Sequence, residues 1–238
     1  MTQDTLPGRT TLLSRLFLAL AFIGILVSLA LVFLWVPNER QQGVVYRIFF
    51  FHVPAGLLSF VAFAIVFVAS IGYLWKGNRT WDMVAHSAAE LGVVFATLSL
   101  TTGSIWARPI WGVWWTWDPR LTTMLILWLI YVGYLMLRAY GAEDARVSRF
   151  ASVVGIIGFV DVPIVFFSVR WWRTQHPQPL LKPGSDFGLT PEMTVTFLIA
   201  LAALSFLFGH LLLERLAMRR MSADVQEMRQ ALSAEEGV

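Results

Sequence analysis

The chain has no cysteine, and charged residues make up only 14% of its 238 positions. The absence of cysteine excludes disulfide bonds, thiolate metal sites and covalent C-x-x-C-H haem attachment to this chain. The low charge, together with 57% hydrophobic residues and a mean hydropathy of +0.66, excludes an ordinary soluble domain. The Lys and Arg residues are scattered and form no basic tract, which argues against nucleic acid as a partner. A lipid bilayer is the expected surrounding.

Six apolar stretches are long enough to cross a bilayer as helices. The first is too long for the apolar part of a signal peptide and lacks a small-residue cleavage site after it, so it is expected to be retained. We find no internal repeat and no separate soluble domain. The predicted fold is an all-α membrane protein with a single transmembrane domain spanning residues 1–238. The predicted spans are 16–36, 53–75, 88–106, 121–137, 150–169 and 192–213, followed by a polar, helix-prone tail at 214–238.

The distribution of Lys and Arg predicts the orientation of these spans. More of these residues fall on the side of the two termini than on the opposite side, which predicts that both termini are cytoplasmic. The short outer loops nevertheless carry more cations than such loops need, which suggests an anionic ligand on that side. These outer cations are Arg40, Arg47, Arg108, Arg120, Arg170, Arg173 and Lys182.

Tryptophan is concentrated in one connection, at residues 106–123, which we call the tryptophan loop. Trp111, Trp114, Trp115 and Trp117 fall within seven residues of one another. Loops usually face water and use small polar residues, so four indoles here suggest the wall of a pocket for a flat aromatic ligand, or an aromatic belt in the membrane interface. Belts line both membrane surfaces, whereas most tryptophans of this chain fall on the predicted outer side. That asymmetry favours the pocket.

Histidine adds a second component on the same side. His52 and His176 fall at outer positions, whereas His86 and His210 fall at inner helix ends, where an interfacial role is expected. Two imidazoles, aromatic walls and cations for the propionates are what a non-covalently held haem b requires. Asp118 is expected to begin a helix as its N-cap or to orient the tryptophan loop. The predicted axial ligands are His52 and His176, and the predicted haem contacts are Trp111, Gly112, Trp114, Trp115, Trp117, Asp118, Arg47, Arg108, Arg120 and Arg173.

The segment from 111 to 122, WGVWWTWDPRLT, resembles the "WWD" signature of bacterial haem-handling membrane proteins. RIFFFHVP at 47–54 and WWRTQH at 171–176 resemble the two histidine motifs that flank it. With six spans and almost no added domain, the chain resembles the haem exporter protein C family (CcmC) of the cytochrome c maturation pathway. The resemblance implies a protein of the bacterial inner membrane that holds haem on its periplasmic face and passes it to a membrane-anchored haem chaperone.

The same resemblance implies further partners, namely ATPase-transporter subunits and a small single-span subunit. The chain has no P-loop, so any ATP hydrolysis belongs to another chain, and this chain is expected to bind and transfer haem and not to act as an enzyme. Three other functions stay open. They are a haem-attaching cytochrome c synthase, a b-type cytochrome subunit, and a transporter with its pocket at the mid-span Asp161 and the nearby Pro163.

Overall fold

A computed structural model describes residues 7–141, 144–177 and 189–235. The regular structure of this part is helical apart from one isolated bridge between Glu39 and Gly43, and six of its helical stretches are long and apolar enough to cross a membrane. The elements are α1 (Pro7–Leu34), the 3₁₀ helix η1 (Val44–Ile48), α2 (Phe49–Lys76), α3 (Arg79–Trp111), α4 (Pro119–Tyr140), α5 (Ala145–Phe159), α6 (Asp161–Trp171) and α7 (Pro191–Glu235).

Short polar caps set where the helices begin. Only Gly77 and Asn78 separate α2 from α3. Gly77 adopts a left-handed conformation (φ 63°), and the side chain of Asn78 accepts a hydrogen bond from the backbone N–H of Thr80. Because this pair both ends one helix and begins the next, the polar residues after it are helical.

The fifth span is divided in two. It was expected at 150–169 with an interruption at Asp161–Pro163, and α5 ends at Phe159 while α6 begins at Asp161. Pro163 therefore lies in the first turn of α6, where its missing N–H would have no helical partner in any case. The division keeps both segments within one candidate span.

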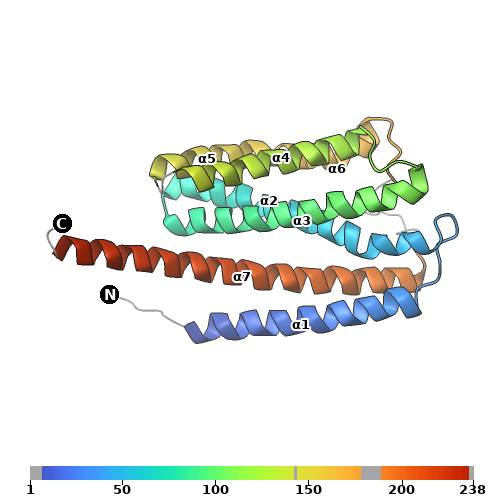
Figure 1. The fold of residues 1–238 in the computed structure, drawn as a ribbon, viewed down its shortest axis with the longest axis horizontal. Coiled ribbons are helices and arrows are strands. Elements are labelled where there is room, and N and C mark those ends of the chain that lie inside the picture. Colours follow the sequence, from blue (N-terminus) through green and yellow to red (C-terminus); the bar gives the residue numbers. More distant parts are fainter. Residues whose placement is uncertain (1–6, 142–143, 178–188, 236–238) are drawn as a thin grey trace.

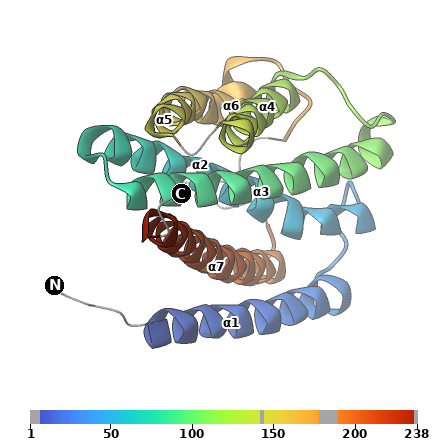
Figure 2. The same ribbon diagram turned by 60° about the vertical axis from the view of Figure 1, so that its left-hand side comes forward.

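The helices form a layered bundle (Figures 1 and 2). α7 lies between α1 and the central pair α2 and α3, and α4, α5 and α6 cover the other side of that pair. The core between these layers includes a stacked pair of rings, Phe63 and Tyr131, with centroids 3.8 Å apart. α1 begins and α7 ends at the same end of the bundle, and α7 continues as helix through most of the predicted polar tail.

Ion pairs fasten the end of the bundle where the two termini lie. Arg138 on α4 makes two hydrogen bonds of 2.8 and 2.7 Å to the buried carboxylate of Asp82 on α3. Arg219 on α7 donates a hydrogen bond of 2.7 Å to Glu90 on α3. The opposite end carries the connections between α1 and α2 and between α3 and α4, together with the end of α6 and the start of α7 (Figure 1).

Candidate functional site

His52 lies in the first turns of α2, and its hydrogen bond fixes which ring nitrogen carries the proton. Its Nδ1 is 3.0 Å from the hydroxyl oxygen of Thr102 on α3. That hydroxyl donates its single proton to the carbonyl oxygen of Leu98, at 2.6 Å, so it accepts the bond from His52. Nδ1 therefore bears the hydrogen, and Nε2 keeps a free lone pair.

His176 follows α6, and its proton also lies on Nδ1, although the acceptor is a different one. Its Nδ1 is 2.9 Å from the backbone carbonyl oxygen of Pro177, which can only accept. Nε2 of His176 is again the nitrogen with the free lone pair. Burial, followed by the positive charge of Arg120, lowers the pKa of His176 to about 4, so the ring is neutral at neutral pH.

The two histidines line one cavity of about 370 Å³ at the end of the bundle opposite the termini. Its wall includes three indoles, those of Trp106, Trp111 and Trp115, and the guanidinium-bearing side chain of Arg120. Most of the remaining lining residues are apolar side chains from α2, α3, α4 and α7. The cavity falls within the range of about 300–1,000 Å³ typical of small-molecule pockets. It combines flat apolar walls with two neutral imidazoles and a cation.

Trp115 contributes an unpaired polar atom to this cavity wall. Its Nε1 is buried and has no hydrogen-bond partner within the described ranges. A buried indole N–H normally finds an acceptor. A bound ligand with an acceptor atom would satisfy this N–H. Trp106 differs in this respect, because its Nε1 donates a hydrogen bond of 2.8 Å to the side-chain oxygen of Gln42.

Asp118 joins the tryptophan loop to the loop of His176. Its carboxylate caps α4 by accepting from the backbone N–H of Arg120 at 2.9 Å, as expected for an N-cap. It also accepts from the Thr174 hydroxyl at 2.7 Å and from the backbone N–H of Gln175 at 2.9 Å. The Thr174 hydroxyl in turn accepts from the backbone N–H of His176 at 3.0 Å. One buried carboxylate thus holds both loops.

Arg120 lies at the cavity and also supports α6. One of its guanidinium nitrogens donates to the backbone carbonyls of Val165 at 2.8 Å and Phe166 at 3.2 Å. This bond ties the start of α4 to α6. It leaves the other guanidinium nitrogens of Arg120 as donors for a ligand in the cavity.

Several predicted contact residues lie outside the cavity lining. Trp114 and Trp117 are 58% and 77% exposed. Gly112 ends α3 in a left-handed conformation (φ 77°), and its carbonyl accepts a hydrogen bond from Arg108. The half-buried Arg47 donates a hydrogen bond to Asn38 and lies over the ring of Phe33, and Arg173 is exposed. Lys182 falls outside the described residues. The cavity lining therefore includes five of the twelve predicted site residues, namely His52, Trp111, Trp115, Arg120 and His176, while Asp118 braces the loops around it.

Sequence reasoning missed the face of α3 that forms one wall. Ser99, Gly103, Trp106 and Ile110 follow one another at spacings of four, three and four residues, and all of them line the cavity. A Cβ on Gly103 would lie 2.9 Å from Cε1 of His52, so the imidazole needs a glycine at this position. The helical spacing from Ser99 to Ile110 could have revealed this face.

The fold and the site together define a multi-pass helical membrane protein with a histidine- and tryptophan-lined cavity at one end. The profile of the family described as "Heme exporter protein C" (CcmC) matches residues 5–231. This chain belongs to that family of haem-handling membrane proteins of cytochrome c biogenesis, which are not catalytic enzymes.

Individual relatives agree with the family profile. Heme exporter protein C of Bradyrhizobium diazoefficiens is 36% identical over 208 residues, covering 84% of this chain and 79% of the relative. The protein of the same name from Escherichia coli K12 is 37% identical over 180 residues, covering 73% of each chain. That of Haemophilus influenzae is 30% identical over 225 residues, covering 94% of this chain and 90% of the relative.

Proposed function

We propose that the cavity holds one haem b non-covalently, with His52 and His176 as axial ligands of its iron. The observation that carries the proposal is that the Nδ1 atom of each ring has a hydrogen-bond partner. Each Nδ1 donates to a fixed acceptor, which leaves Nε2 of each histidine able to bind a metal. Metal-binding histidines commonly use their second ring nitrogen in this way, since the outer hydrogen bond orients the ring and makes it more basic.

The rest of the lining suits a porphyrin. Trp106, Trp111 and Trp115 offer flat apolar surfaces for the macrocycle. The free donors of Arg120 and the unpaired Nε1 of Trp115 are suited to a propionate carboxylate. With imidazole in both axial positions, the iron would have no open position for oxygen chemistry. This suits a haem that is to be transferred without reacting.

The proposed role is to hold haem and hand it over. The Lys and Arg distribution favours an orientation with both termini in the cytoplasm and the cavity on the periplasmic face of the bacterial inner membrane. There the haem would pass to a membrane-anchored haem chaperone. The ATPase-transporter subunits and the small single-span subunit expected from the family would supply energy and assembly, since the chain has no P-loop.

The ligand assignment is tested by the absorption spectrum of the purified protein after addition of haem. We expect a low-spin bis-histidine spectrum, its loss in the double variant His52→Ala, His176→Ala, and its retention when His86 and His210 are both replaced by Ala. These control histidines do not line the cavity. A low-spin spectrum that survives in the His52, His176 double variant would remove both residues as ligands.

A second experiment separates hand-over from direct haem attachment. Haem-loaded protein is incubated either with an apocytochrome alone or with the haem-binding domain of a chaperone. We expect transfer to the chaperone and no covalent haem on the apocytochrome. Covalent attachment to the apocytochrome in the absence of any other protein would instead identify a cytochrome c synthase.

A further inference from the structure

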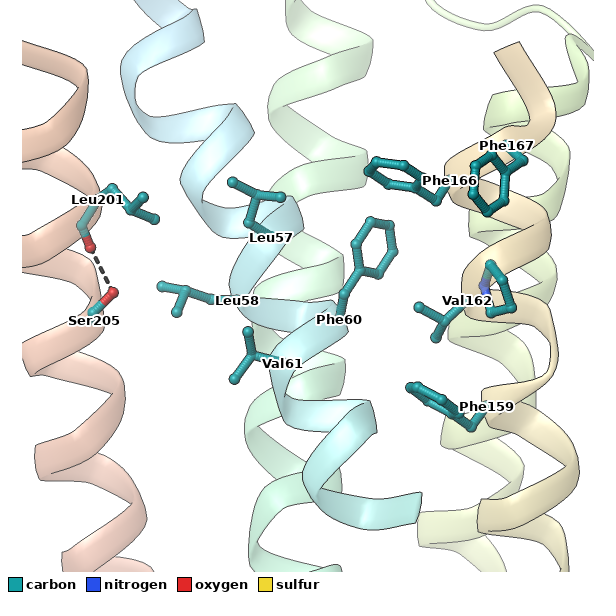
Figure 3. A pocket seen from close by; sticks show the side chains of 11 residues that line it. Leu57, Leu58, Phe60, Val61, Phe159, Val162, Phe166, Phe167, Leu201 and Ser205 are labelled. Carbon is teal, nitrogen blue, oxygen red and sulfur yellow. Dashed lines mark hydrogen bonds between the residues drawn. The ribbon is translucent and has the colours of Figure 1, made fainter. Parts of the chain in front are cut away.

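An apolar groove runs along the membrane-spanning part of the bundle below the cavity, between α6 and α7, with α2 as its floor (Figure 3). Its volume is about 660 Å³. Ser205 is its one residue with a polar side chain, and the hydroxyl donates to the carbonyl of Leu201 within α7. The groove therefore presents an almost entirely hydrocarbon surface. Its lining comprises Leu57, Leu58, Phe60, Val61, Phe159, Val162, Pro163, Phe166, Phe167, Leu201 and Ser205.

This groove adjoins the histidine cavity. Four residues, Leu57, Phe60, Phe166 and Leu201, line both spaces. They come from α2, α6 and α7, and in Figure 3 the side chains of Phe60 and Phe166 extend toward each other. The two spaces are thus separated only by side chains that belong to both walls, and rotation of these side chains would connect them.

The groove also faces the bilayer. Val61 on its floor is 47% exposed and lies within the candidate span Val44–Lys76, where lipid is the expected surrounding. The polarity of the lining increases from the groove to the cavity. The groove is lined almost entirely by apolar side chains, and the cavity adds Arg120 and the two histidines. This gradient matches an amphipathic ligand with a broad apolar body and an anionic end.

We propose, on the basis of the haem site proposed above, that haem enters the cavity sideways from the bilayer through this groove. The porphyrin ring then stays in apolar surroundings throughout, while its propionates move toward Arg120. The wall shared with the cavity favours haem over a lipid tail or a helix of another subunit, because neither of these would require the groove to adjoin imidazoles and a cation. The volume is also sufficient for a ligand of this size.

The natural absence of cysteine permits a reversible test. Ser205→Cys places a single thiol in the groove, where a benzyl methanethiosulfonate reagent attaches a bulky group that dithiothreitol removes. The full-length protein is placed in nanodiscs, and haemin dissolved in lipid vesicles is supplied. The rate of appearance of the low-spin spectrum and its final amplitude are both recorded. Val94→Cys, on a lipid-exposed position of α3 that borders neither space, is the matched control.

We expect labelling at residue 205 to slow haem uptake by about tenfold or more, to leave the final spectrum unchanged, and to be reversed by reduction. Labelling at residue 94 should have no effect. An unchanged rate at 205 would overturn the proposal, and so would a lost final spectrum, which would make the groove part of the binding site. If the unlabelled variant and the unsubstituted protein both lack a histidine-dependent spectrum, the proposed haem site itself has failed.

Discussion

The carboxylate of Asp118 accepts a hydrogen bond of 2.9 Å from the backbone N–H of Gln175, 57 residues further along the chain. This bond joins the end of the tryptophan loop to the residue immediately before His176. A carboxylate that accepts several hydrogen bonds in a buried position is strongly held, because charge-assisted bonds are about twice as strong as neutral ones. The position of His176 therefore depends on a residue that does not line the cavity.

Replacing Asp118 tests this dependence. Asp118→Asn keeps a good N-cap but cannot accept all three bonds, so we expect haem affinity to fall by about 10- to 100-fold with little loss of stability. Asp118→Ala should in addition lose about 1 kcal/mol of stability from the missing cap. Haem titration and thermal unfolding of the apoprotein measure the two effects.

The matched control is Asp144, which caps α5 by accepting from the backbone N–H of Arg146 at 3.1 Å. Asp144→Ala should lose a similar amount of stability and keep its haem affinity. Equal losses of affinity in the Asp118→Ala and Asp144→Ala variants would show that the first acts only through general stability.

Gly103 makes a second prediction, because its backbone lies against the ring of His52. In Gly103→Ala the new Cβ would lie 2.9 Å from Cε1 of His52, so the ring must move and its bond to Thr102 must weaken. We expect haem affinity to fall by about tenfold or more. Gly133→Ala, where a Cβ would meet nothing within 4 Å, should bind haem normally and gain about 0.5–1 kcal/mol of stability. Normal haem binding by Gly103→Ala would contradict the assigned position of the ring.

The sequence predicted the number and type of the spans, because about 20 apolar residues in succession leave few alternatives to a membrane helix. It also predicted that Asp118 begins a helix as its N-cap. The cavity walls were harder to predict. Consecutive residues of an irregular loop point in different directions, so the pattern at 111–117 could not separate the cavity-lining Trp115 from the exposed Trp117. The hydrogen bond from His52 to Thr102 could not be predicted either, since it depends on α2 and α3 lying side by side.

Thr102 gives a third prediction, concerning the proton on His52. Thr102→Val removes the acceptor for Nδ1 while keeping the shape of the side chain, so the ring loses its orientation and its preferred tautomer. Loss of such an outer partner typically lowers metal affinity by about 10- to 100-fold. We expect a decrease in this range for haem, measured by titration. Thr194→Val, at a hydroxyl that donates within α7 to the carbonyl of Thr190, should leave haem affinity unchanged. Unaltered affinity in Thr102→Val would show that the tautomer is fixed in some other way.

His176 predicts a pH effect in the haem-free protein. Its folded pKa of about 4 lies below the value of about 6.5 expected in the unfolded chain. As the pH falls from about 6.5 to about 4, the unfolded chain takes up a proton here that the folded protein does not, so this residue lowers the free energy of unfolding across that window. Nuclear magnetic resonance of labelled histidine should show a midpoint near 4. Arg120→Gln should raise this midpoint, because it removes the neighbouring positive charge. A midpoint above 6 in the unsubstituted protein would contradict the described burial of the ring.

The tryptophan loop divides into two pairs with different expected roles. Trp111 and Trp115 line the cavity, so replacing both by Ala should weaken haem binding itself. Trp114 and Trp117 are exposed at the same end of the bundle, where large aromatic side chains are suited to contact a partner protein. Replacing these two by Ala should leave the haem spectrum and affinity unchanged and slow transfer to the chaperone. Stopped-flow transfer from haem-loaded protein measures this rate. Because the two double variants remove the same number of indoles from one loop, equal effects on affinity would show that the loop acts as a whole and that exposure does not separate binding from hand-over.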